Sequence, residues 1–184
     1  FDWAREMVET AKELGFPFMA GSSLPVARRV PSIDLPLGSE VEEVVGIGVG
    51  NIDSYDIHAL EAMQCLAERR RGGETGVKSV RGLRGDSVWQ ALDAGAWDPV
   101  LFEACLCRSL SLKPADETHR HTYPSREELP GLLERDPVAY QIEYRDGVKA
   151  TMLLMAGLKQ DITAAVRIKS QPDPFSVLFY LGEG

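Results

Sequence analysis

The chain has 184 residues, of which 44% are hydrophobic and 26% are charged, so it can bury a sizeable core. Its formal net charge of -8 repels phosphate backbones, which argues against a nucleic-acid partner. The basic run Arg69-Arg70-Arg71 is interpreted as a solvated helix end rather than as a binding patch. No apolar stretch approaches the ~20 residues of a membrane span, so no membrane association is expected.

The cysteines and histidines give no pattern of a disulfide framework or a metal site. Cys65, Cys105 and Cys107 are odd in number and lack C-x-x-C spacing, which favours a reducing compartment. We therefore expect a cytoplasmic protein. His119-x-His121 stands in a polar loop without a neighbouring cysteine, so no metal is expected there.

The first twenty residues have the pattern of one helix and one strand. Apolar residues recur at helical spacing after Asp2, and Gly15 can supply a left-handed stop. Residues 16–20 then form a short apolar run that predicts a buried strand. We interpret residues 1–20 as the last helix and strand of a parallel sheet, and expect the natural protein to extend further toward the N-terminus.

Residues 21–184 are predicted to form one α+β domain. Strands are expected at 41–50 and 77–83, with a helix between them over 53–70 and two shorter helices beginning at Asp86 and Asp98. From residue 138 the apolar period changes to two, and Arg145-Asp146-Gly147 is typical of a hairpin turn. The predicted architecture is a largely antiparallel sheet of about six strands with helices on one face.

The other face of this sheet is too apolar to lie wholly in water. Its large side chains include Leu153, Met155, Leu178 and Tyr180. Scattered surface hydrophobes are one interpretation. We favour the alternative, in which this open face packs against a second subunit in a homo-oligomer.

His58 is the candidate for chemistry. It falls near the start of the predicted helix, with Ser54 and Glu61 about one turn away on the same side. An imidazole flanked by a carboxylate can act as a general base on a substrate hydroxyl. A half-buried histidine satisfied by the backbone or by Glu61 is the competing interpretation.

The glycines of the preceding strand give a weaker signal. Gly46, Gly48 and Gly50 lie on one strand face and would leave room for a ligand over the helix start. Asn51 stands where the dinucleotide-binding fingerprint has its third glycine, so no cofactor site is assigned to this strand. Close packing of a neighbouring element explains glycines at alternate strand positions more simply.

The order of these segments resembles the Gfo/Idh/MocA oxidoreductases from their interdomain boundary to the C-terminus. The resemblance covers essentially the whole chain and rests on the phrases Phe-Pro-Phe-Met-Ala-Gly, Asp-Ser-Tyr-Asp-Ile-His-Ala-Leu-Glu and Val-Lys-Ser-Val. It implies that a preceding Rossmann domain binds NAD or NADP, and that this chain supplies a substrate pocket and an oligomer interface. It also implies that the chain alone binds no cofactor and is inactive.

Residue by residue, His58 matches the family's proton-transfer histidine. Ser54 stands where the family has an aspartate, and Asp53 and Glu61 are the carboxylates left to orient the ring. The resemblance further implies substrate contacts from a loop, where the matching positions are Ser22, Ser23 and Arg28 or Arg29. From the expected geometry, Tyr55 at the helix start lines the same pocket.

The predicted function is therefore the substrate-binding and oligomerisation half of an NAD(P)-dependent oxidoreductase acting on a sugar or polyol hydroxyl. The alternative is a non-catalytic carbohydrate-binding or assembly module of the same fold, in which Ser54 in place of the aspartate marks lost chemistry.

Overall fold

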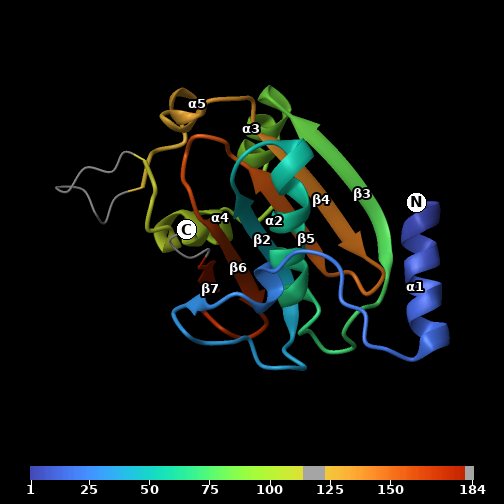
Figure 1. Cartoon of the computed structure of the whole chain (residues 1–184). Helices are drawn as coiled ribbons and strands as arrows, with labels where there is room; N and C mark the ends of the chain where they lie inside the picture. Colours follow the sequence, from blue (N-terminus) through green and yellow to red (C-terminus); the bar gives the residue numbers. More distant parts are fainter. Residues whose placement is uncertain (114–122, 181–184) are drawn as a thin grey trace.

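The computed structural model describes residues 1–113 and 123–180 and has an α+β fold (Figure 1). One mixed sheet contains seven strands: β1 (Arg29–Val30), β2 (Val41–Gly48), β3 (Val77–Arg84), β4 (Val138–Tyr144), β5 (Lys149–Leu154), β6 (Ile162–Ile168) and β7 (Phe175–Phe179). The described residues contain five α-helices: α1 (Asp2–Leu14), α2 (Ile52–Ala67), α3 (Asp86–Asp93), α4 (Pro99–Arg108) and α5 (Leu129–Leu132). A short 3-10 helix, η1, spans Leu24–Val26.

The strands run in the order β1-β7-β6-β2-β5-β4-β3. Only β2 and β5 are parallel neighbours, so the predicted predominance of antiparallel pairing is confirmed. The sequence did not indicate β1, which is two residues long and lies between Pro25 and Pro36. The predicted hairpin forms, with the Gly147 amide donating to the Tyr144 carbonyl over 3.0 Å.

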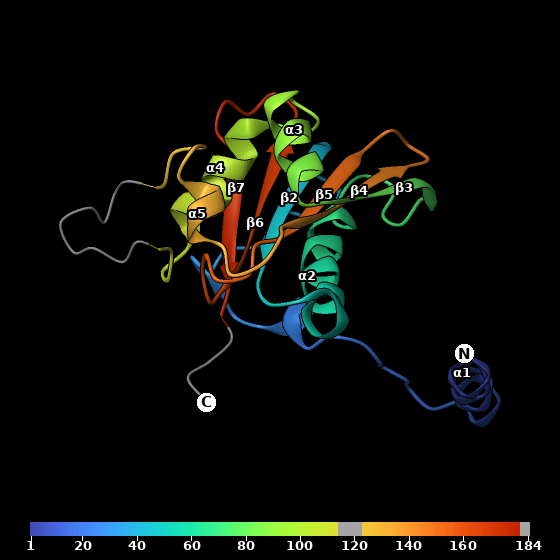
Figure 2. The same ribbon diagram turned by 90° about the horizontal axis from the view of Figure 1, so that it is seen from above.

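Helices cover both faces of the sheet, and the prediction of helices on one face is wrong (Figure 2). Helix α2 packs on one face, above a core that includes Met63, Leu66 and Met152. Helices α3, α4 and α5 lie on the other, above a second core that includes Trp97 and Phe102. The chain therefore has three layers around two hydrophobic cores.

The sheet face expected to meet a second subunit is buried by the chain itself. Leu153 and Met155 have no exposed surface and Leu178 is 2% exposed, because α4 and its neighbours cover them. Tyr180, beyond the end of β7, is the exposed member at 43%. The expectation of an open sheet face is thus corrected. Because these side chains are already buried, they give no reason for a two-fold partner at this position.

The N-terminal segment stands apart from the three layers (Figures 1 and 2). Helix α1 forms as expected and ends at Gly15, whose φ of 69° is the left-handed stop. Residues 16–20 form no strand and are exposed, which corrects the predicted buried strand. Ala11 is the buried residue of α1, while Trp3 is 80% exposed.

The basic run after α2 is not a uniformly solvated helix end. Arg70 is 3% exposed, donates to Asp146 Oδ2 over 2.6 Å and stacks over the Tyr144 ring at 4.4 Å. Arg71 points to solvent, with 75% of its side chain exposed. The interpretation of the run is therefore wrong for Arg70, which joins the end of α2 to the β4–β5 hairpin.

Candidate functional site

The candidate site lies where η1 packs against the first turns of α2. The sequence folds this way because Leu24 is buried and anchors η1, while Ala59 and Met63 hold α2 on the sheet. His58 falls on the flank of α2 that faces η1, and its side chain is half-buried.

Within the described part of the chain, one polar contact holds the His58 ring. Nδ1 lies 2.8 Å from Ser22 Oγ, and these residues are 36 positions apart in the sequence. Ser22 Oγ also accepts the Leu24 amide over 3.1 Å, which fixes the serine at the start of η1. The other ring nitrogen, Nε2, has no hydrogen-bond partner among the described residues. It is not one of the buried polar atoms that lack a partner, so solvent reaches it.

The carboxylates predicted to orient His58 do not contact it in the described structure. Asp53 is exposed and forms no hydrogen bond to the ring. Glu61 instead packs against Gly21. A methyl group added to Gly21 would lie 2.9 Å from Glu61 Oε1. Ser22 therefore takes the position expected of a carboxylate, and the predicted His58–Asp53 or His58–Glu61 pair is corrected.

The other predicted substrate residues divide into two groups. Tyr55 is near His58, with ring centroids 6.4 Å apart, and its own ring packs against Gly50. Ser23 and Arg28 are exposed, and no side-chain contact joins them to His58 within the described residues.

Arg29, the alternative to Arg28, has a structural position instead. Its guanidinium pairs with Asp34 at 3.1 Å, donates to the Pro25 carbonyl over 3.0 Å and lies over the Phe179 ring. The side chain is 13% exposed, so it fastens β1 and the preceding turn rather than facing a ligand.

The glycine face of β2 has no room for a ligand over Gly46 and Gly48. A methyl group on Gly48 would lie 2.6 Å from the Ala59 Cβ, and one on Gly46 would lie 3.4 Å from the Met63 Cβ. These glycines let α2 approach the sheet closely, as the packing interpretation predicted. The expectation of ligand space over them is corrected, since α2 fills it.

Three of the surface cavities formed by the described residues lie elsewhere. One of about 400 Å³ is lined by Trp3, Met7, Phe16 and Phe18 at α1. The others, of about 320 and 310 Å³, adjoin Asp86 at the start of α3 and Phe102 on α4. None of the three is lined by His58, Tyr55, Ser22 or Ser23.

No metal site is found in the described part of the chain, where no three histidine, cysteine, aspartate or glutamate side chains cluster at ligand distance. His119 and His121 lie outside the described residues.

No helix within residues 1–113 and 123–180 is long and apolar enough to cross a bilayer.

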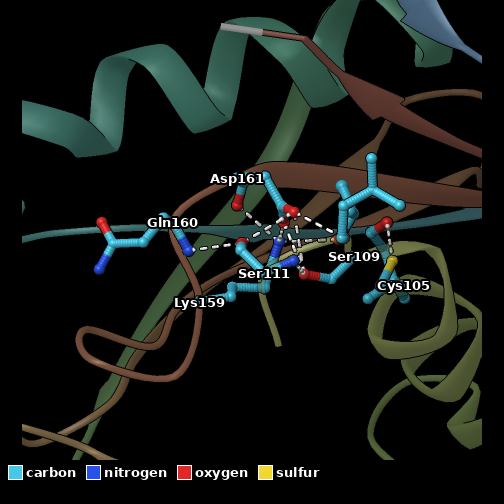
Figure 3. Close-up of polar contacts among 9 residues, drawn as sticks. Cys105, Ser109, Ser111, Lys159, Gln160 and Asp161 are labelled. Atoms are coloured by element: carbon cyan, nitrogen blue, oxygen red, sulfur yellow. Dashed lines mark hydrogen bonds and ion pairs between the residues drawn. The ribbon is translucent and has the colours of Figure 1, made fainter. Parts of the chain in front are cut away.

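A buried ion pair was missed by the sequence analysis (Figure 3). Lys159 has no exposed side-chain surface, and its ammonium donates to Asp161 Oδ1 at 3.0 Å, the Asp161 carbonyl at 2.6 Å and Thr163 Oγ1 at 3.0 Å. All three of its protons are therefore used. Burial lowers the pKa of Lys159, and the Asp161 carboxylate opposes that shift.

Asp161 connects this pair to the end of α4. Its carboxylate accepts the Leu110 amide at 2.8 Å and the Ser109 and Ser111 hydroxyls at 2.9 Å. Burial raises the pKa of this carboxyl, but Lys159, the Leu110 amide and the Ser109 hydroxyl outweigh burial and lower it. The nearby Cys105 thiol is wholly buried, which raises its pKa to about 12 and leaves it unreactive at neutral pH.

The saturated donors of Lys159 indicate a structural role, because no proton or lone pair at the ammonium is left for a substrate. The sequence signal was two charged residues, Lys159 and Asp161, between the apolar runs 152–158 and 162–166.

Comparison with known proteins gives no assignment: no family model, curated protein or solved structure matches this chain.

Proposed function

We propose that this chain is the substrate-side domain of an NAD(P)-dependent oxidoreductase acting on a sugar or polyol, with His58 exchanging a proton with the reacting oxygen. The observation that carries the proposal is the His58–Ser22 contact of 2.8 Å, which fixes one ring nitrogen and leaves the other to solvent. An imidazole held in this way can give a proton to a reacting oxygen or take one from it.

The charge around the site supports a neutral substrate. Asp53, Asp56 and Glu61 lie on the same first turns of α2 as His58. Their negative charge disfavours phosphate or carboxylate ligands, while carboxylates are good acceptors for hydroxyl groups. A polyhydroxylated molecule without charge suits this surface, and the Tyr55 ring beside His58 offers a flat apolar contact.

The nicotinamide cofactor does not fit on this chain's glycine-bearing strand, because α2 occupies the face that Gly46 and Gly48 share. In the proposal the cofactor lies on a separate nucleotide-binding domain. The exposed apolar residues of the N-terminal segment, including Trp3, Met7 and Phe18, suit the contact with that domain.

Turnover by the intact protein tests the proposal. Cofactor reduction or oxidation is followed with a panel of sugars, polyols and their keto forms, for the wild type, for His58→Gln and for Arg71→Gln as an exposed control. We expect His58→Gln to lower kcat by about 10²- to 10⁴-fold with ligand binding retained. Absence of turnover across the panel for the wild type refutes the proposal.

A non-catalytic carbohydrate-binding or assembly module is the second candidate. It is favoured by the lack of a carboxylate on the His58 ring in the described structure and by the position of the three cavities away from it. In that case the intact protein binds sugars without changing the cofactor, and His58→Gln alters binding alone.

A further inference from the structure

The hydroxyl of Ser22 makes two contacts, and together they decide the direction of its hydrogen bond to His58. A serine hydroxyl has one proton and two lone pairs. The Leu24 amide is a donor, so it uses one lone pair of Ser22 Oγ at 3.1 Å. The 2.8 Å contact with His58 Nδ1 is then made either by the serine proton or by the second lone pair.

The set of donors and acceptors around Ser22 favours the serine proton. If His58 Nδ1 donated instead, the Ser22 proton would have no protein acceptor among the described residues. With Ser22 donating, each group at the contact is satisfied and the Leu24 amide, the hydroxyl and the imidazole form one chain. Donors and acceptors in such a chain strengthen each other.

We infer that Ser22 is a positioning residue that holds neutral His58 as the tautomer protonated on Nε2. Nε2 is the nitrogen that solvent reaches, so the resting ring presents a donor to a ligand. A donor of this kind recognises a carbonyl oxygen, which only accepts hydrogen bonds. The site therefore takes the keto form of its substrate, and this step rests on the proposed function.

The same serine also serves the charged ring. In the imidazolium both nitrogens carry protons, so Nδ1 must donate, and the second lone pair of Ser22 Oγ can accept after the hydroxyl rotates. The imidazolium can then pass its Nε2 proton to the oxygen of a carbonyl being reduced. After that transfer the ring is neutral and protonated on Nδ1, and exchange with water restores the resting tautomer.

Nitrogen-15 NMR of the labelled 184-residue chain tests the tautomer without any assay of activity. Long-range proton–nitrogen correlations at high pH distinguish imidazoles protonated on Nε2 from those protonated on Nδ1. The chain has three histidines, and the signals lost in His58→Gln identify the ring. We expect the wild-type ring to be protonated mainly on Nε2.

Three variants examine the role of Ser22. Ser22→Ala should change the ratio of the two tautomers by about fivefold, the effect of one hydrogen bond. Ser22→Thr keeps a hydroxyl and should restore the wild-type ratio, and the exposed neighbour Ser23→Ala should leave it unchanged.

A wild-type ring protonated on Nδ1 overturns the inference, whatever the variants do. A ratio that is the same in Ser22→Ala and the wild type overturns it as well. Failure of the proposed function gives a different result, in which the tautomer is as expected and the intact protein reduces no keto sugar. Turnover together with the Nδ1 tautomer would refute the role of Ser22 alone.

Discussion

Lys159 Nζ lies 3.0 Å from Asp161 Oδ1 at a position where the lysine side chain has no exposed surface. The carboxylate also holds Ser109, Leu110 and Ser111, so this pair fastens the end of α4 to the start of β6. Helix α4 in turn covers the sheet face opposite α2. The ion pair thus helps to hold the third layer in place.

Removing one member of this pair should destabilise the fold strongly. Asp161→Ala leaves the Lys159 ammonium buried without its counter-charge, and we expect a loss of about 3–5 kcal/mol in the free energy of unfolding. Urea titration followed by circular dichroism measures it. The matched control is Gln160→Ala, an exposed side chain between the two, for which the expected change is within about 0.5 kcal/mol. Equal losses in the two variants would contradict the structural role.

Acid should weaken the same contact. The pKa of Asp161 is lower in the folded state than in the unfolded chain. The stability that its carboxylate contributes is therefore fully present above the unfolded-state pKa of about 3.9, and it is lost as the pH falls through the lower folded-state pKa. The wild type should therefore be more stable than Asp161→Asn at pH 7, and the gap should narrow below pH ~4. Unfolding titrations from pH 7 to 2.5 measure the gap. A constant gap over that range would show that the carboxylate is not stabilised by folding.

The sequence predicted local structure well where a periodic pattern was present. The period-two runs from residue 138 became β4 to β7, and Asp98 caps α4 by accepting the Val100 amide. It did not predict which apolar sheet face is covered by the chain itself. An apolar strand face has the same pattern under a helix of its own chain as under a partner subunit.

Contacts between distant positions explain the other errors. Ser22 and His58 are 36 residues apart, and Ser111 and Asp161 are 50 apart. Residue spacing within one helix predicted Glu61 as a partner of His58, but the segment just before η1 supplies the partner, Ser22. Only the packing of η1 on α2 brings Ser22 into reach.

Arg70 should not be replaceable by lysine. Its guanidinium donates to Asp146, Thr75 and the Ala67 carbonyl, and it stacks on Tyr144, a set of contacts that requires a planar group with several donors. We expect Arg70→Lys to cost about 1–3 kcal/mol of unfolding free energy. The neighbouring Arg71→Lys should be neutral, because that side chain is 75% exposed. Thermal unfolding of the two variants side by side makes the comparison, and indistinguishable midpoints would refute it.

Gly48 should be intolerant of a single methyl group. Gly48→Ala places a carbon 2.6 Å from the Ala59 Cβ and 3.0 Å from Leu154 Cδ2, so α2 must move away from the sheet. We expect a loss of about 1–3 kcal/mol, typical of overpacking. Gly82→Ala on β3 is the control, because a methyl group there meets nothing within 4 Å. It should be neutral or slightly stabilising in the same urea titration, and a similar loss in both variants would point to strand propensity instead of packing.

Leu153 distinguishes a core position from a subunit interface. The side chain has no exposed surface and packs in the core beneath α3 and α4, so Leu153→Glu buries a charge that has no partner. We expect a loss exceeding ~4 kcal/mol, comparable with the stability of a whole domain, and therefore a largely unfolded chain with reduced far-UV dichroism. Val80→Glu on β3, where the side chain is 61% exposed, should keep the wild-type spectrum. If the face instead met a second copy, Leu153→Glu would keep the far-UV spectrum and convert a dimer to a monomer in light scattering, and that outcome would overturn the three-layer arrangement.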